Sequence, residues 1–363
     1  MIKNNEPIKL KNAKAWRTYL GGSLLRDFLG LSNTKDDHFP EEWIMSLVSA
    51  RNAGRENIVN EGLSIIDDNE NISLKDLISK DPSYYLGEAF SKKYNDTTGV
   101  LIKLIDSSER LSVQVHPDKN TAKKLFNSNY GKTECWHILG GREINGEKPC
   151  IYLGFKENIT QEYWKDLFNK QDIKEMLNCM HKINVKIGET YLINGGIPHA
   201  IGAGCFLVEI QEPTDYTIRV ERITDSGFKI ADSMCHQGLG FNNMFKCFHY
   251  NGLSLDKTLN KYLISKKTIN KTTSCKYESY IDYNETKMFS LYGLTIHNDT
   301  YTLKLNNVFS GIFILEGSAT MKCGNSEYTI KKADEFFLPK NCKSLTFTTN
   351  DNFKLLHFYG PKV

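Results

Sequence analysis

Four side chains of the kind that bind divalent metal ions lie in three short segments: Gln114, His116, Glu134 and His199. The amide and the first imidazole are two residues apart in LSVQVHP (111–117), so a strand there points both to one face. The second histidine follows a turn rich in glycine and proline, GGIP (195–198), which fixes its backbone at the start of a strand. Each histidine alone is more typical of a buried structural residue. Together, two imidazoles, a carboxylate and a further oxygen donor predict a divalent metal site with one position left open.

Polar side chains continue these strand faces. Ser112 shares the face of Gln114, and Lys132 shares the face of Glu134. Lys103 interrupts the apolar run VLIKLID (100–106), where an ammonium group is costly unless it meets an anion. That anion is either part of a ligand or a carboxylate inside the same barrel, and both interpretations stay open.

The segment CFLVEIQEPTDYTIRVE (205–221) adds more charge to a strand pattern. Its alternation places Glu209 opposite the apolar face, and further along Asp215, Thr217 and Arg219 share one face. Arg219 has the same two interpretations as Lys103, a ligand contact or an internal ion pair. These residues are the candidates for acid–base and electrostatic chemistry beside the metal.

Short strand-like segments separated by turns must position these residues. We predict strands over 100–106, 111–116, 133–139 and 150–155 and a helix over 118–126, and Ser73 with Asp76 forms a capping box that starts another helix. Apolar residues at helical steps over 160–182 predict a helical insert packed on the core; they are Tyr163, Trp164, Leu167, Phe168, Ile173, Met176, Leu177 and Met180. The expected fold is mainly β, an antiparallel barrel or sandwich with helical insertions.

A second, smaller barrel is predicted at the C-terminus. A helix in NGLSLDKTLNKYL (251–263) precedes a new series of strands that runs to the end of the chain. The histidines of this region, His297 and His357, show no liganding pattern, so we expect a structural or interfacial role. The predicted domains are 1–262 and 263–363.

Composition excludes several classes of function. The 363 residues carry a net charge of +3, without the basic stripe of a nucleic-acid-binding protein. We expect no membrane span, because no run of about 18 apolar residues occurs. The chain begins with a polar segment, and its nine cysteines form no C-x-x-C, so we expect reduced thiols and a cytoplasmic protein. The oligomeric state is left open.

Several motifs, in order, resemble those of class I mannose-6-phosphate isomerases, also called phosphomannose isomerases. They are LSVQVHPD (111–118), GKTECWHIL (131–139), GGIPHAIGAG (195–204) and EIQEPTDYTIRV (209–220), with looser likeness in AWRTYLGG (15–22) and PEEWIMSLVSA (40–50). The resemblance covers about residues 10–245. It implies a zinc-dependent jelly-roll (cupin-type) barrel with helical elaborations and a second, metal-free cupin-like barrel.

The resemblance also implies roles for individual residues. Gln114, His116, Glu134 and His199 correspond to the ligands of one Zn²⁺ per chain, and Arg219 to the catalytic arginine. Ser112, Lys103 and Lys132 correspond to positions at the phosphate end of the substrate, and Glu209 and Asp215 to acidic positions at the reacting end. The implied reaction interconverts mannose 6-phosphate and fructose 6-phosphate through a cis-enediol(ate), with Glu209 as the expected base and Lys132 as a carrier of a hydroxyl proton.

The sequence departs from the family in its first hundred residues. SLVSARN (46–52) stands where the family usually has an S-x-H-P-N-like sequence, and residues 22–40 and 52–95 match loosely. Two alternative functions stay open. Two histidines and a carboxylate also bind iron in non-haem oxygenases, although those enzymes have no need of a phosphate pocket. A cupin that binds a sugar phosphate without converting it is the other alternative.

Overall fold

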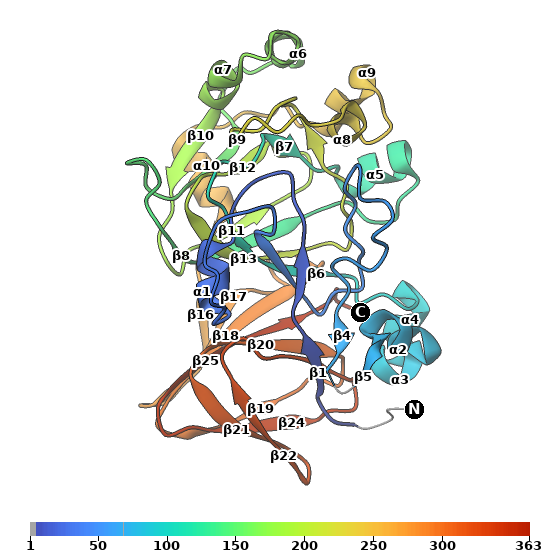
Figure 1. Ribbon diagram of the computed structural model, residues 1–363, viewed down its shortest axis with the longest axis vertical. Coiled ribbons are helices and arrows are strands. Elements are labelled where there is room, and N and C mark those ends of the chain that lie inside the picture. Colours follow the sequence, from blue (N-terminus) through green and yellow to red (C-terminus); the bar gives the residue numbers. More distant parts are fainter. Residues whose placement is uncertain (1–4, 68) are drawn as a thin grey trace.

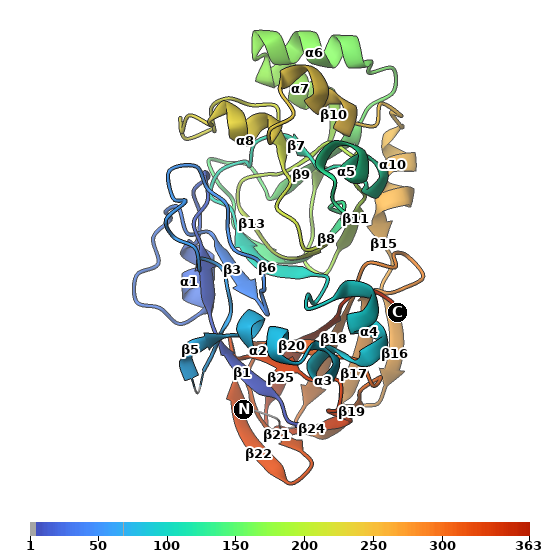
Figure 2. The ribbon, with the colours of Figure 1, turned by 90° about the vertical axis from the view of Figure 1, so that its right-hand side faces the viewer.

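Two β barrels lie one above the other along the long axis of the molecule (Figure 1). This structure is a computed structural model that describes residues 5–67 and 69–363. Helices gather at the top of the upper barrel, and a second group packs beside the junction of the two barrels (Figure 2). No described helix is both long and apolar enough to cross a membrane.

The upper barrel is built from two antiparallel sheets. The seven-stranded sheet contains, in spatial order, β15 (Leu263–Ile264), β11 (Thr190–Ile193), β8 (Glu134–Gly141), β13 (Cys205–Gln211), β6 (Leu101–Asp106), β3 (Glu41–Ile44) and β2 (Ala13–Ala15). The five-stranded sheet contains β10 (Met180–Asn184), β9 (Cys150–Phe155), β12 (His199–Ile201), β7 (Gln114–Val115) and β14 (Ile218–Arg219).

The lower barrel also has two sheets. The larger contains β16 (Lys267–Lys271), β17 (Cys275–Ile281), β18 (Ser290–His297), β25 (Asn352–Tyr359), β20 (Ser310–Glu316), β23 (Glu335–Leu338), β1 (Ile8–Lys11), β4 (Ile65–Ile66) and β5 (Asn69–Ser73). The smaller contains β19 (Thr300–Lys304), β24 (Ser344–Thr348), β21 (Ser318–Cys323) and β22 (Ser326–Lys331). The predicted mainly β, two-barrel fold is therefore confirmed.

The helices are short. They are α1 (Ser23–Phe28), α2 (Leu74–Lys80), α3 (Pro82–Leu86), α4 (Glu88–Tyr94), α5 (Lys119–Phe126), α6 (Gln161–Lys170), α7 (Ile173–Asn178), α8 (Asp232–His236), α9 (Phe241–Met244) and α10 (Leu255–Tyr262), with a 3₁₀ turn at Phe245–Cys247. The predicted capping box is present: Ser73 Oγ accepts from the Asp76 backbone, and the Asp76 carboxylate accepts from the Ser73 backbone.

Two predicted elements differ in detail. The insert over 160–182 is two helices followed by a strand that begins at Met180, because Gln171 leaves the helical conformation with φ 52°. Tyr163, predicted to pack in the core, is 40% exposed, whereas Trp164 and Phe168 are buried. The strand over 111–116 is shorter than expected, and Leu111 packs in a different apolar cluster from Val113 and Val115.

The two barrels share a sheet and an apolar layer. β1, near the N-terminus, pairs with β23 of the lower barrel, so the larger lower sheet includes strands from the first 73 residues. Conversely, β15 pairs with β11 of the upper barrel. The structure therefore does not divide cleanly at 262/263, and that boundary stays a prediction.

Candidate metal centre and adjoining cavity

Strand pairing brings the predicted metal ligands together. β7 lies between β12 and β14, so Gln114 pairs with His199 on one side and with Arg219 on the other. Glu134, at the start of β8, pairs with Gln211 of β13 in the other sheet. Gln114, His116, Glu134 and His199, the predicted metal-binding cluster, thus come from both sheets of the upper barrel and face its interior.

The nitrogen and oxygen atoms of this cluster converge on one point. Glu134 Oε2 lies 3.2 Å from His116 Nε2, and Glu134 Oε1 lies 3.1 Å from His199 Nε2. The Nε2 atoms of the two histidines are 3.2 Å apart, and the side-chain amide nitrogen of Gln114 lies 3.3 Å from His199 Nε2. Among the described residues, His116, Glu134 and His199 are the one group of histidine, cysteine and acidic side chains close enough to hold a metal ion.

The hydrogen bonds around this cluster orient its nitrogen and oxygen atoms as a bound cation would require. His116 Nδ1 donates to the Tyr216 carbonyl, and His199 Nδ1 donates to the Ile197 carbonyl, both at 2.8 Å. This orients both rings so that their Nε2 atoms face each other, as metal-binding imidazoles do. Burial lowers the pKa of His116 to about 3, which keeps it neutral. Both oxygens of Glu134 are buried and receive no hydrogen bond. A divalent ion at this point would satisfy all of these electron-rich atoms, and a 180° turn of the Gln114 amide would present its oxygen.

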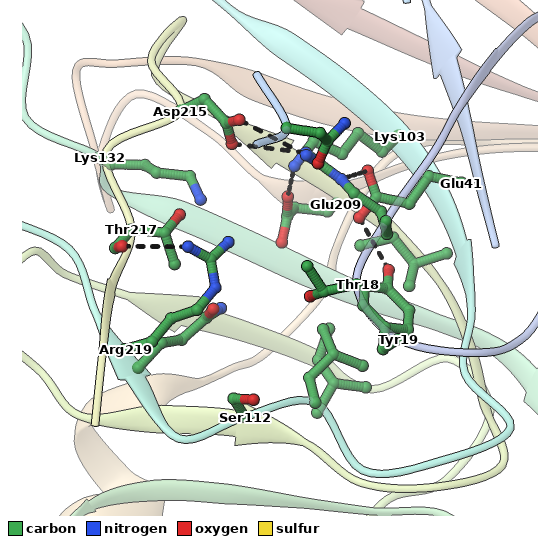
Figure 3. Close-up of a pocket in the computed structure, with 16 residues that line it drawn as sticks. Thr18, Tyr19, Glu41, Lys103, Ser112, Lys132, Glu209, Asp215, Thr217 and Arg219 are labelled. Atoms are coloured by element: carbon green, nitrogen blue, oxygen red, sulfur yellow. Dashed lines mark hydrogen bonds and ion pairs between the residues drawn. The ribbon is translucent and has the colours of Figure 1, made fainter. Parts of the chain in front are cut away.

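A polar cavity, shown in Figure 3, adjoins the predicted metal-binding cluster. It is lined by four cations (Arg17, Lys103, Lys132, Arg219), three carboxylates (Glu41, Glu209, Asp215), and Thr18, Tyr19, Asn52, Ile105, Leu111, Ser112, Gln114, Ile201 and Thr217. Every residue that we predicted for catalysis or phosphate binding lines this cavity.

Lys103 is held by a carboxylate of the protein. Its Nζ donates to Glu209 Oε1 at 2.9 Å, and Trp136 Nε1 donates to Glu209 Oε2, also at 2.9 Å. Burial opposes the charge of Lys103, but Glu209 and Glu41 outweigh this effect and raise its pKa. Of the two interpretations for Lys103, the internal ion pair is therefore present. Contact between Lys103 and a substrate phosphate stays a prediction.

Arg219 differs from Lys103. In the part of the chain that the structure describes, it forms no ion pair within 4 Å; it donates to the carbonyls of Met234 (3.0 Å) and Thr217 (3.3 Å). Burial lowers its pKa. In Figure 3 its guanidinium group points into the cavity, so its charge is available to a bound anion.

Lys132 lies between the metal-binding cluster and the cavity. Its Nζ is 3.0 Å from His116 Nε2 and 3.6 Å from Glu134 Oε2. Burial lowers the pKa of this ammonium group. Lys132 therefore lies beside the predicted metal position.

The sequence did not identify the N-terminal residues of the cavity. Arg17 donates to Glu41 Oε2 at 2.8 Å and to both oxygens of Asp215 at 3.4–3.5 Å. Tyr19 also donates to Glu41, at 2.7 Å. Burial opposes ionisation of Glu41, but Arg17 and Lys103 outweigh it and lower the pKa to about 2. A signal was present in the adjacent acidic residues of PEEW, which stand within an otherwise apolar strand.

Comparisons with known proteins agree with this architecture. The family model "Phosphomannose isomerase type I, catalytic domain" matches residues 11–134, and the model "Mannose-6-phosphate isomerase, cupin domain" matches residues 279–356. The probable mannose-6-phosphate isomerase GmuF of Bacillus subtilis is 34% identical over 137 residues, which are 36% of this chain and 40% of that relative.

Two solved structures share the fold. The mannose 6-phosphate isomerase from Bacillus subtilis superposes with a TM-score of 0.74 and 22% identity, over 97% of this chain and 99% of the other. A structure described as mannose 6-phosphate isomerase bound with zinc and yttrium has a TM-score of 0.71 and 14% identity, over 98% of this chain and 100% of the other. The two family matches together cover more than half of the chain. The chain therefore belongs to the type I phosphomannose isomerase family.

Proposed function

We propose that this chain is a zinc-dependent aldose–ketose isomerase that interconverts mannose 6-phosphate and fructose 6-phosphate. The observation that carries the proposal is the convergence of the His116 and His199 Nε2 atoms with the Glu134 carboxylate, which receives no hydrogen bond, at the edge of a charged cavity. The isomerase family of the chain supports this function over an iron oxygenase or a binding-only cupin. We place the enzyme in the cytoplasm, in keeping with its nine free cysteines.

Gln114, His116, Glu134 and His199 would hold one zinc ion. When bound, zinc supplies a Lewis acid that stabilises negative charge on the sugar oxygens O1 and O2. Glu134 is the one negatively charged side chain among these four ligands. With zinc bound, the site would therefore keep a net positive charge that faces the substrate.

The isomerisation moves a proton between C2 and C1 and needs a carboxylate near both atoms. Glu41 already accepts three hydrogen bonds, from Arg17, Tyr19 and Trp43. Burial opposes ionisation of Asp215, but Arg17 and other nearby cations hold its pKa below the ordinary value, which makes it a weaker proton acceptor. Each oxygen of Glu209 accepts one hydrogen bond and keeps a second lone pair. We therefore assign Glu209 as the base.

Arg219 and Lys132 serve the oxygen atoms of the reacting carbons. The Arg219 guanidinium is placed to stabilise charge that develops on O1 and O2, because no carboxylate of the described chain neutralises it at contact distance. Lys132, beside the metal-binding cluster, is placed to carry a proton between the two hydroxyl groups. Asp215, held by Arg17, would orient these two cations.

The phosphate would lie toward Ser112. In Figure 3 Ser112 and Lys103 occupy opposite sides of the cavity, and Lys103 is already neutralised by Glu209. We therefore assign the direct phosphate contact to Ser112, and Lys103 the role of holding the base Glu209. This revises the expectation that Lys103, Ser112 and Lys132 bind the phosphate together.

The test is turnover of mannose 6-phosphate by purified, zinc-loaded protein, followed by a coupled assay for fructose 6-phosphate. Other aldose phosphates and unphosphorylated mannose are measured alongside. Preference for mannose 6-phosphate is expected. Binding without product would favour the binding-only cupin, and faster conversion of another aldose phosphate would keep the chemistry but change the substrate.

A further inference from the structure

Two cysteines of the lower barrel are in direct contact. Cys323 ends strand β21, and Cys342 lies in the turn after β23, where its backbone N–H donates to the Pro339 carbonyl. Their Sγ atoms are 3.3 Å apart. All nine cysteines lie in the described part of the chain, and this is the one hydrogen bond between two thiols among them.

One member of the pair borders a surface hollow. Cys323 is 6% exposed and lines a surface hollow together with Asn5, Glu6, Gly324, Asn325 and Asn341, whereas Cys342 is fully buried. The hollow, about 520 Å³, is large enough for a small oxidant to reach Cys323. The buried Cys342 thiol is then the neighbour that any oxidised form of Cys323 would meet.

The hydrogen bond favours this order of reaction. With Cys342 as the donor, it lowers the pKa of the Cys323 thiol and raises that of Cys342. Thiolates react with peroxides and thiols do not, so the more exposed sulfur is also the more reactive one. Cys342 is in position to act as the resolving thiol.

We propose that Cys323 and Cys342 form a reversible oxidation site that a hydroperoxide converts to a disulfide. The Cys323 thiolate attacks one peroxide oxygen, the O–O bond breaks, and the product is a sulfenic acid plus hydroxide (or alkoxide). The Cys342 sulfur then attacks the sulfenic sulfur, an S–S bond forms, the S–OH bond breaks, and the Cys342 proton leaves with the hydroxyl group as water. Two thiols are oxidised by two electrons in total, and the peroxide is reduced. A dithiol reverses the reaction by exchange.

The site is separate from the proposed catalysis. All cavity-lining residues lie in the first 219 residues, whereas the cysteine pair belongs to the lower barrel. The disulfide would close a loop between positions 323 and 342, which constrains the unfolded chain and raises the Tm of the oxidised protein. Activity is expected to be unchanged, so the proposal stands or fails independently of the isomerase assignment.

The experiment treats the full-length, reduced protein with a stoichiometric amount of hydrogen peroxide. Thiol titration after denaturation is expected to fall from nine to seven, and dithiothreitol is expected to restore nine. Peptide mapping without reductant should find the peptides of Cys323 and Cys342 joined and two hydrogens lighter than the free pair. The mapping uses the native sequence, so it decides the question even if a variant fails to fold.

Matched variants identify the partners. Cys323→Ser and Cys342→Ser should each form no disulfide, whereas Cys275→Ser, a control in the same barrel, should still lose two thiols. The proposal is overturned if nine thiols persist, if another pair is joined, or if Cys323 is oxidised without linkage to Cys342.

Discussion

Lys103 and Glu209 form a buried ion pair across strands β6 and β13, with Nζ and Oε1 2.9 Å apart. The pair lies inside the cavity that the upper barrel encloses, and both side chains are at least 95% buried. Because removal of one partner leaves the other charge buried and unpaired, the pair couples the stability of the barrel with the shape of the site.

Lys103→Met is therefore expected to lower stability by about 3–5 kcal/mol, the usual cost of breaking a buried pair. Lys92→Met is the control, because Lys92 forms an exposed pair with Glu88 and should change the Tm little. Thermal unfolding of both variants checks this. An unchanged Tm with a ten- to hundredfold rise in KM, the loss of a charge-assisted bond of about 1.5–3 kcal/mol, would instead mean that Lys103 binds the phosphate directly.

Arg219→Ala should lower kcat about a hundredfold or more with little change in KM, because the guanidinium would act on charge that develops in the transition state. Arg222→Ala is a matched control, since Arg222 stacks on Phe168 and Phe241 and does not line the cavity. Steady-state kinetics with Tm measurements separate the two. A purely structural role would lower the Tm and the activity of Arg219→Ala together.

Glu209→Gln should lower kcat by about 10²–10⁴-fold and abolish exchange of the substrate C2 proton with solvent deuterium. The amide oxygen still accepts from Lys103, but the buried ammonium then lacks its counter-charge, so the Tm should also fall and is measured on the same samples. Asp215→Asn should retain exchange, and Glu212→Gln, a carboxylate outside the cavity, should behave like the unmodified enzyme. Exchange that disappears only in Asp215→Asn would transfer the role of base to Asp215.

Two carboxyl groups at the junction of the barrels predict a pH-dependent stability. Glu42 and Glu335 alternate with Glu41 and Phe336, so both face the apolar layer between the barrels, and all four of their oxygens are buried without a hydrogen-bond partner. Burial raises the pKa of Glu42 to about 8, and burial together with Glu42 raises the pKa of Glu335 well above its ordinary value.

The folded protein is expected to lose stability as the pH rises, because burial disfavours the ionised forms of Glu42 and Glu335. Both pKa values are higher in the folded state than in the unfolded state. The stabilisation of the folded state that this difference provides is complete below the ordinary carboxyl pKa and is lost as the pH rises through about 8. Each group changes stability by up to about 1.4 kcal/mol per pH unit in that interval. The Tm should fall between pH 6 and 9, and less steeply in Glu42→Gln or Glu335→Gln. The same slope in these variants and in an exposed control, Glu88→Gln, would contradict this explanation.

Strand alternation in the sequence places Gln114 and His116 on one face, and the structure brings Glu134 and His199 to the same point, so the predicted metal ligands lie together. It did not predict Arg17, which meets Asp215 across 198 residues through an irregular segment without periodicity. It also did not show that the neighbours Glu41 and Glu42 have different environments: Glu41 lines the cavity, whereas Glu42 faces the junction between the barrels. Two adjacent acidic residues show no apolar face, so only the packing of β3 between two barrels decides their roles.

The most direct test of the central claim is a zinc titration of metal-free protein, with bound zinc and turnover of mannose 6-phosphate measured on the same samples. Chelation should abolish turnover, and activity should rise in proportion to bound zinc and level off at one ion per chain. His116→Ala and His199→Ala should lose both the tightly bound ion and turnover, while His249→Ala, a partly exposed histidine paired with Asp118, should keep both. Full turnover without metal, or a full equivalent of tightly bound zinc in either ligand variant, would contradict the account.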